Sequence, residues 1–477
     1  MAGSGDDTRA AAASAAATGA GARGTRIART FRPAWRRIGA FVPTRAATAL
    51  LFLAALVVYA VEAVAWPVTK GRDTWDYLSY YLELWHRDAV FPHMMSFRTP
   101  ITPIVVGVPM QVGGDHLLEA VMGLLYAVSI VAYGAVALSF GRLPALLTSV
   151  TLLAYPSYAS LFHSAASDGV FAAAFALWTL VVVRALREPS TGRFAAVGAG
   201  IAVLALTRPA GAVLLAAVAL PLVTKVSWRR RARLGGAILV CAVLPLAAWA
   251  VHNGIRYGEY AFSRTTEASG AKAQAREDPL TYGHRVANTF WVLLNQRPIT
   301  EPSRRQVTTP PPGAQARARS SLWYARLVKR AKEGFRWCAS SYIDLCTVEP
   351  STISKDPAQQ KKYVNLVRRI KTWNADLPSR NGSVFVAEQL KRVEWKFPRP
   401  PFWLLLTLIG LVLRRPRDAR VLITLGVFAG LVLLLHAAVE PPKVAEYALP
   451  MYPIFILIGI ASVTGDRDAK GTSRQRR

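Results

Sequence analysis

Two carboxylates stand close together in a short aromatic segment near residue 75. The chain reads Gly-Arg-Asp-Thr-Trp-Asp-Tyr over 71–77, so Asp73 and Asp76 are three residues apart. On a helix this spacing places both acids on one face of its first turn. One interpretation is an N-cap, Asp73, with Asp76 as its capping-box partner. The other is a general base that accepts a proton from an acceptor hydroxyl.

Two arginines further along the chain are each followed by a proline one or two residues later. Arg98 lies in Phe-Arg-Thr-Pro and Arg208 in Leu-Thr-Arg-Pro. Such an arginine can extend to lipid headgroups, or its guanidinium can bind phosphate oxygens in a bidentate way. Asp168 fits a helix N-cap. His163 is interpreted as an interface residue rather than a metal ligand, because no His or Cys pair has ligand spacing.

The composition indicates where these residues work. Of 477 residues, 52% are hydrophobic and 18% are charged, whereas an average soluble domain has about 25% charged residues. The apolar residues gather in blocks long enough to cross a bilayer core of about 30 Å. The net charge is +30, but the basic residues lie mainly between apolar blocks, where membrane orientation explains many of them. We therefore expect a multi-pass protein that contacts membrane lipids and no nucleic acid.

Ten apolar segments are predicted to be transmembrane helices, which makes the fold class an all-α membrane protein. With the N-terminus in the cytoplasm, every segment that ten spans place inside is basic, in agreement with the positive-inside rule. Both termini are then cytoplasmic, and the site is extracytoplasmic at the cell membrane. The predicted spans are 47–66, 117–139, 143–160, 168–186, 193–207, 209–226, 235–251, 401–413, 421–439 and 447–464.

The spans divide the chain into a transmembrane core, a C-terminal group of helices, outer segments and two tails. The first outer loop carries Trp75, Leu78, Leu82 and Trp85 at helical spacing, a pattern typical of an interfacial helix. The predicted parts are a disordered basic tail 1–45, core 46–251 with outer loop 67–116, outer segment 252–400, C-terminal helices 401–465, and basic tail 466–477.

The large outer segment lies between the seventh and eighth predicted spans. It carries 26 Lys and Arg against 12 Asp and Glu, and helical patterns occur near 284–296, 321–336 and 359–373. Cys338 and Cys346 fall in it and are predicted to form a disulfide, because the outer compartment is oxidising. Cys241 lies within a span and is expected to be a small buried residue.

Taken in order, these elements resemble a family, the polytopic GT-C glycosyltransferases of the protein-mannosyltransferase and aminoarabinose-transferase type. The resemblance covers roughly residues 45–225, and a weaker similarity occurs at 446–450. It rests on an acid with a tyrosine four positions later, an Arg-x-Pro element, a proline in the third span, an acidic start to the fourth and a Leu-Thr-Arg-Pro turn: Asp73, Tyr77, Arg98, Pro156, Asp168 and 206–209.

The resemblance implies a GT-C-like bundle and an inverting enzyme that takes a sugar from a polyprenyl-phosphate donor. The acceptor would be extracytoplasmic, and its class, a cell-envelope glycan, a lipid or a protein, stays open. Asp73 matches the family's catalytic acid. Asp76 is a second candidate, because Thr74 stands where many members have another acid.

The same comparison assigns roles to the other candidates. Arg98 and Arg208 match positions that line the carrier phosphate, and Lys443 with Tyr447 stands where the family has Arg-Tyr. Fixed guanidinium groups would stabilise the charge that grows on the leaving phosphate. Tyr77, His163 and Asp168 are expected to support the site.

Other function classes stay open on the sequence. A transporter or lipid flippase predicts charged residues within the spans. A non-catalytic envelope scaffold would bind anionic wall polymer through its basic outer segment, and a lipid-linked oligosaccharide ligase is a neighbouring enzyme class. No Gly-rich phosphate loop is present, so a soluble nucleotide-sugar donor is not indicated. No cofactor is predicted, and participation of a divalent metal ion stays open.

Overall fold

The computed structural model describes residues 45–69, 74–84, 98–257, 260–263, 356–376, 382–414, 416, 418–439 and 449–465. In these ranges the regular structure is helical apart from isolated β-bridges, such as that between Thr69 and Ser164. The predicted all-α class is therefore confirmed for the described part. The chain divides into two compact units, residues 1–50 and 51–477, and the contacts below lie within the second.

Each predicted span falls on an apolar helical element. Among the described residues, four helices are long and apolar enough to cross a membrane, and a bent pair makes a fifth candidate. The four are α2 (Arg45–Ala65), α5 (Ile101–Leu138), α8 (Ser167–Arg187) and α10 (Trp228–Tyr257). The remaining apolar elements are α6 (Arg142–Leu153), α7 (Pro156–Ser160), η1 (Leu161–His163), α9 (Thr191–Thr207), η2 (Pro209–Val223), α18 (Pro400–Ile409), η5 (Gly410–Arg414), α19 (Ala419–Val439), η7 (Leu449–Met451) and α21 (Tyr452–Thr464).

Two predicted boundaries differ from the structure. The span expected at 117–139 belongs to α5, which already begins at Ile101 after Pro100 and is interrupted at Gly114, where φ is 66°. The span expected at 143–160 is broken between α6 and α7, which meet at 62°. Pro156 explains the second break, because proline has no N–H to continue α6 and disfavours a helical conformation at the residue before it, here Tyr155, with φ −108° and ψ 89°.

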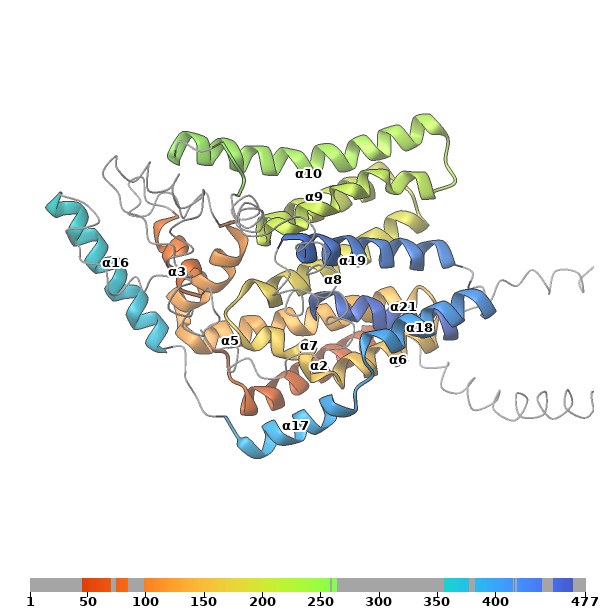
Figure 1. Ribbon diagram of the computed structural model, residues 1–477, viewed down its shortest axis with the longest axis horizontal. Helices are drawn as coiled ribbons and strands as arrows, with labels where there is room; N and C mark the ends of the chain where they lie inside the picture. The colour runs from red at the N-terminus through yellow and green to blue at the C-terminus, as the bar shows by residue number, and fades with distance from the viewer. Residues whose placement is uncertain are drawn as a thin grey trace, which may run out of the picture. The chain divides into compact units, whose positions relative to one another are not determined.

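The membrane-type helices pack side by side (Figure 1), with α5 and α8 at the centre and α10 at the edge. In their most apolar stretches, 61% of α5 and 67% of α8 is buried, against 28% of α10. Aromatic rings fill the centre, including the fully buried Tyr126, Tyr133, Tyr158 and Phe162. The exposed Leu and Val side chains of α10 suit a lipid-facing surface.

Three further helices pack on this bundle: α3 (Thr74–Glu83) contacts α5, α16 (Pro357–Asp376) contacts α3, and α17 (Val384–Lys396) contacts α7. α16 confirms the helical pattern predicted near 359–373, whereas the patterns at 284–296 and 321–336 lie outside the described residues. α17 was not predicted; Ser383 caps it by accepting a hydrogen bond from the Val386 N–H.

The polar contacts between connecting segments sort them into two groups, and each group lies on one predicted side of the membrane. Arg187 pairs with Asp418 at 2.5 Å, and Arg230 donates to the Pro189 carbonyl. All of these residues lie on predicted inner segments. Segments that are predicted to lie outside also bond to one another, as in the hydrogen bond from the Thr102 hydroxyl to the Thr207 carbonyl. The side of the membrane on which each group lies stays a prediction.

Candidate active site

The first outer loop is bonded to the connection between α7 and α8. The Thr69 N–H donates to the His163 carbonyl at 3.1 Å, and the Ala165 N–H donates to the Thr69 carbonyl at 2.9 Å. The Thr74 hydroxyl, fully buried at the start of α3, donates to the Ala165 carbonyl at 2.8 Å. These bonds hold Thr69 and Thr74 in place, whereas Asp73 lies outside the described residues.

α3 is packed against α5 through a close approach at Gly107. A Cβ atom at this position would overlap the ring of Tyr81, so glycine lets the two helices meet. The Tyr81 hydroxyl donates to Gln111 Oε1 at 2.5 Å. Leu78 is fully buried, and Leu82 packs with Ile370 of α16. The apolar face expected at the membrane interface is thus covered by protein at these two positions; the side chains of Trp75 and Trp85 lie outside the described residues.

Asp76 forms an ion pair with Arg98 at the end of the same loop. Arg98 Nη2 lies 2.5 Å from Asp76 Oδ2, and the side chains are 14% and 3% exposed. The Arg98 guanidinium also lies over the Tyr77 ring, 5.4 Å from its centroid. Arg98 is therefore held by two residues of α3, and its side chain is largely buried instead of reaching outward as a headgroup anchor would.

Asp168 and Arg208 form a second pair of the same kind. Arg208 Nη1 lies 3.0 Å from Asp168 Oδ1, and the two side chains are 14% and 13% exposed. The predicted N-cap role of Asp168 is wrong, because Ala166 occupies the N-cap position and Asp168 lies within the first turn of α8. Its charge still lies at the positive end of the helix dipole, as predicted.

One hydrogen bond joins the segments that carry the two arginines. The Thr102 hydroxyl, fully buried in the first turn of α5, donates to the Thr207 carbonyl at 3.1 Å. Thr207 precedes Arg208, and Thr102 follows Arg98 by four residues. The Arg-Thr-Pro and Thr-Arg-Pro elements, far apart in the sequence, therefore meet at one end of the bundle.

Sequence reasoning missed Glu62, which the structure places beside His163. His163 Nε2 lies 4.0 Å from Glu62 Oε2, and both side chains are buried. The ring of Tyr59 stacks on the imidazole with 4.2 Å between centroids. Within the described part of the chain, Glu62 Oε2 and both His163 ring nitrogens make no hydrogen bond. An acid inside an otherwise apolar span is a signal that could have identified Glu62.

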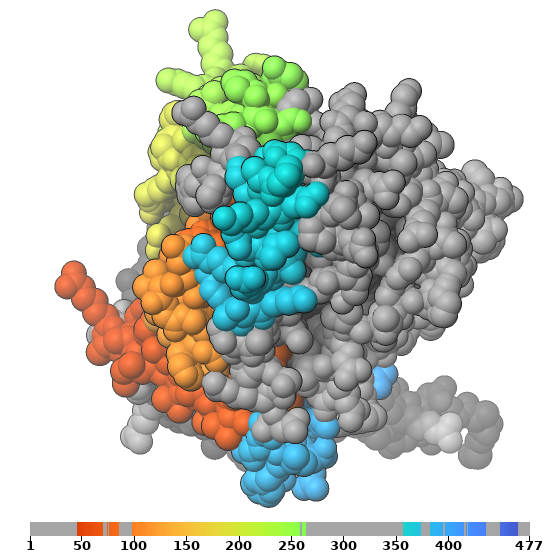
Figure 2. Space-filling model, turned by 90° about the vertical axis from the view of Figure 1, so that its left-hand side faces the viewer, coloured from red at the N-terminus to blue at the C-terminus, as the bar shows by residue number. Residues whose placement is uncertain are grey.

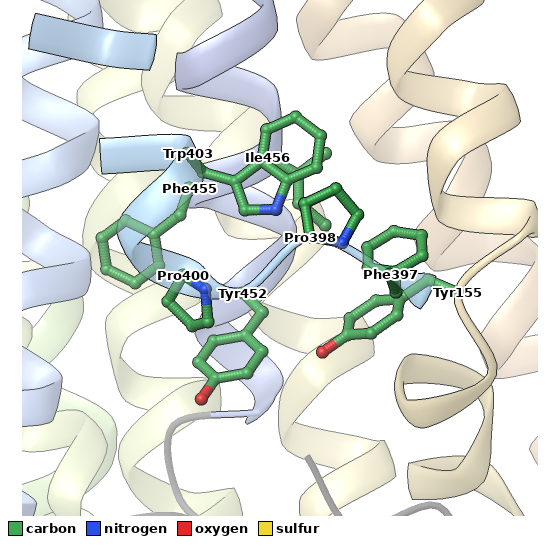
Figure 3. Close-up of a pocket in the computed structure, with 8 residues that line it drawn as sticks. All are labelled: Tyr155, Phe397, Pro398, Pro400, Trp403, Tyr452, Phe455 and Ile456. Carbon is green, nitrogen blue, oxygen red and sulfur yellow. The ribbon is translucent and has the colours of Figure 1, made fainter. Parts of the chain in front are cut away.

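An aromatic junction lies where α17 leads into α18. Tyr155, at the break between α6 and α7, stacks on Phe397 with 4.3 Å between ring centroids. The Ser157 N–H in the first turn of α7 donates to Glu394 Oε2 at 3.2 Å. Figure 3 shows the small pocket at this junction, lined also by residues of α18 and α21. Its volume, about 10 Å³, suits about one water molecule.

Several predicted site residues lie outside the described residues: Asp73, Lys443, Tyr447, Cys338 and Cys346. Among the residues that the structure describes, no group of three or more His, Cys, Asp or Glu could hold a metal ion. Cys241 is a free, partly buried cysteine. On α3, burial raises the pKa of the Tyr80 phenol well above its usual value, with a smaller contribution from Tyr257. Tyr80 is therefore a neutral residue at ordinary pH.

Comparison with known proteins supports the GT-C resemblance. Residues 104–252 match the model of a family described as dolichyl-phosphate-mannose-protein mannosyltransferase. The matched range contains Asp168 and Arg208 but begins after Asp76 and Arg98. No curated protein matches the chain.

Two solved structures of ArnT from Cupriavidus metallidurans are similar to the chain. One is bound to undecaprenyl phosphate; it has 18% sequence identity and a TM-score of 0.37, and the match covers 87% of this chain and 77% of that one. The other is the apo state, with 16% identity, a TM-score of 0.33, and coverage of 88% and 78%.

Proposed function

We propose that this protein is a membrane glycosyltransferase of the GT-C type, which moves a sugar from a polyprenyl-phosphate carrier to an extracytoplasmic acceptor and inverts the anomeric centre. The proposal rests mainly on Arg98 and Arg208, each of which is paired with an aspartate. The segments that carry them are joined by the hydrogen bond from the Thr102 hydroxyl to the Thr207 carbonyl. The family match supports the donor class, because the description of that family names a polyprenyl-phosphate sugar.

The two arginines would act on the carrier phosphate. As the bond between the anomeric carbon and the phosphate oxygen breaks, its electron pair moves to the phosphate and negative charge grows there. A guanidinium has five N–H donors in a fixed fork, and a single carboxylate cannot accept from all five of them. Because Asp76 and Asp168 already orient the arginines, little reorganisation is required as the charge develops. The leaving phosphate then needs no separate proton donor.

A carboxylate of the first outer loop would act on the acceptor. Its hydroxyl attacks the anomeric carbon from the face opposite the carrier, and the carboxylate takes the hydroxyl proton. Asp76 Oδ2 already accepts a hydrogen bond from Arg98. We therefore assign the base to Asp73 and give Asp76 the task of positioning Arg98. Lys443 and Tyr447 would add to the phosphate site, and Tyr77 would support Arg98.

Replacing Arg208 by lysine tests the phosphate site. Lysine keeps the charge but loses the planar fork, so we expect transfer to fall by at least about tenfold, with weaker binding of polyprenyl phosphate. Arg193→Lys is the matched control, because Arg193 pairs with Glu188 on a predicted inner segment. Both variants are compared with the parent by transfer rate, donor binding and thermal stability. Full activity of Arg208→Lys and Arg98→Lys together would contradict the proposal.

A transporter or lipid flippase is the second candidate, and the buried Glu62 and His163 favour it. Ionisable side chains enclosed between spans are typical of transport pathways. The two functions differ in their products: a glycosyltransferase forms a glycosylated acceptor in vesicles that lack any gradient, whereas a transporter moves an unchanged substrate across the vesicle membrane. Movement without a new glycosidic bond would favour the transporter.

A further inference from the structure

One side of α16 is apolar and packs against α3. Ile370 is 1% exposed and packs with Tyr81 and Leu82 of α3, with Leu366 and Trp373 at the margin of the contact. The Trp373 and Tyr81 ring centroids are 6.3 Å apart. The apolar side of α16 is therefore used to attach it to α3, the helix that carries Asp76.

The opposite side of α16 is exposed and basic. Lys361 and Arg368 are seven residues apart, two turns of helix, and Lys371 lies three residues beyond Arg368. All three side chains are exposed. Figure 2 shows α16 at the surface, between α10 and α17 in that view. A cationic surface of this kind attracts anionic ligands and raises their local concentration.

The exposed side chains of α16 do not suit insertion into a membrane. An interfacial helix buries Trp, Phe or Leu below the headgroups. Among the described side chains of α16, Val364 is the one large hydrophobic that is exposed, with an exposed fraction of 37%. The Arg369 guanidinium covers the ring of Trp373, 5.0 Å from its centroid. The basic face therefore suits a ligand in the aqueous phase rather than the acyl region of a bilayer.

We propose that Lys361, Arg368 and Lys371 form a docking surface for the acceptor, and that this acceptor is an anionic glycan carrying carboxylate or phosphate groups. This rests on the proposed function and adds the acceptor class. The surface lies on the helix attached to α3, so a chain bound along α16 would have its hydroxyls close to the first outer loop. Its cations would select anionic over neutral chains through charge and not through contacts at the reacting hydroxyl.

Binding of a defined glycan tests this without relying on transfer. The full-length protein in phosphatidylcholine nanodiscs is titrated with labelled oligogalacturonate and with its neutral methyl ester, and fluorescence anisotropy is measured. We expect the anionic oligomer alone to bind, with an affinity that falls as salt is added. The triple variant Lys361→Gln, Arg368→Gln, Lys371→Gln should bind about tenfold more weakly, since each exposed contact contributes modestly.

A charge-matched control separates this surface from the net charge of the protein. Lys225→Gln, Arg229→Gln, Arg233→Gln removes the same charge from an exposed region on the predicted inner side and should bind normally. Equal binding by the parent and the α16 variant overturns the proposal. Failure of both proteins to bind the oligogalacturonate also overturns it. The same holds if the only affinity that the variant loses is for nanodiscs of anionic lipid. If the proposed enzyme function fails instead, transfer is absent while binding still follows the α16 charges.

Discussion

At the scale of single residues, Asp76 and Asp168 have parallel places in the candidate site. Each carboxylate holds one guanidinium at 3.0 Å or less, and each of these side chains is at least 86% shielded, since the largest exposure is 14%. A carboxylate that orients an arginine and a carboxylate that accepts a proton have different requirements. The first needs its hydrogen-bonding geometry, whereas the second needs an oxygen that can become protonated.

This difference predicts losses of different size for the two acids of the first outer loop. In Asp73→Asn the amide cannot take the acceptor's proton, so transfer should fall by about a hundredfold or more. In Asp76→Asn the side-chain oxygen can still accept from Arg98, so a smaller loss and weaker donor binding are expected. Transfer rate, donor affinity and thermal stability are measured for each. A dead Asp76→Asn with an active Asp73→Asn would exchange the two roles.

At the scale of helices, the position of α3 depends on its contact with α5 at Gly107. The Tyr81 ring occupies the space that a side chain would need there. In the interior of a helix, exchange of glycine for alanine is ordinarily favourable. At Gly107 the close contact with Tyr81 should reverse that preference.

Gly107→Ala should therefore destabilise the protein by about 1 to 3 kcal/mol through overpacking. Gly236→Ala in α10 is the matched control, because a Cβ there meets no atom within 4 Å, and it should be neutral or stabilising by up to about 1 kcal/mol. Thermal unfolding in detergent and transfer activity are followed for both. If Gly107→Ala is as stable as the control and fully active, α3 does not depend on this contact.

What the sequence predicts at this scale is limited to local patterns. Within the described residues, hydropathy placed a span on each apolar helix but missed the first part of α5, and periodicity located α16, because both depend on neighbours along the chain. The pairing of Arg98 with Asp76 and of Arg208 with Asp168 depends on segments 22 and 40 residues apart, which no periodicity encodes. The acid Glu62 inside an apolar span was a signal in the sequence, but its contact with His163, which belongs to a different element, is visible only in the structure.

At the scale of the whole molecule, the connectivity of the spans determines which side the site faces. A reporter fused near Pro311 should behave as extracytoplasmic, and one fused near Pro189 as cytoplasmic, because an even number of predicted spans separates Pro189 from the N-terminus and an odd number separates Pro311. Cys338 and Cys346 should be oxidised in protein made in its native membrane. An internal reporter at Pro311, or two free thiols, would remove the active site from the outer side.

The hydrogen bond from Thr102 to Thr207 has a consequence for biosynthesis. A chain made from its N-terminus presents Arg98 before the helix that ends at Thr207 has been made. The two arginine segments can meet only after α9 has entered the bilayer, and α16 reaches α3 later still. A nascent chain arrested before residue 207 would therefore carry Asp76 and Arg98 but not the complete proposed phosphate site. Carrier lipids could engage the arginines together only once synthesis has passed the middle of the bundle.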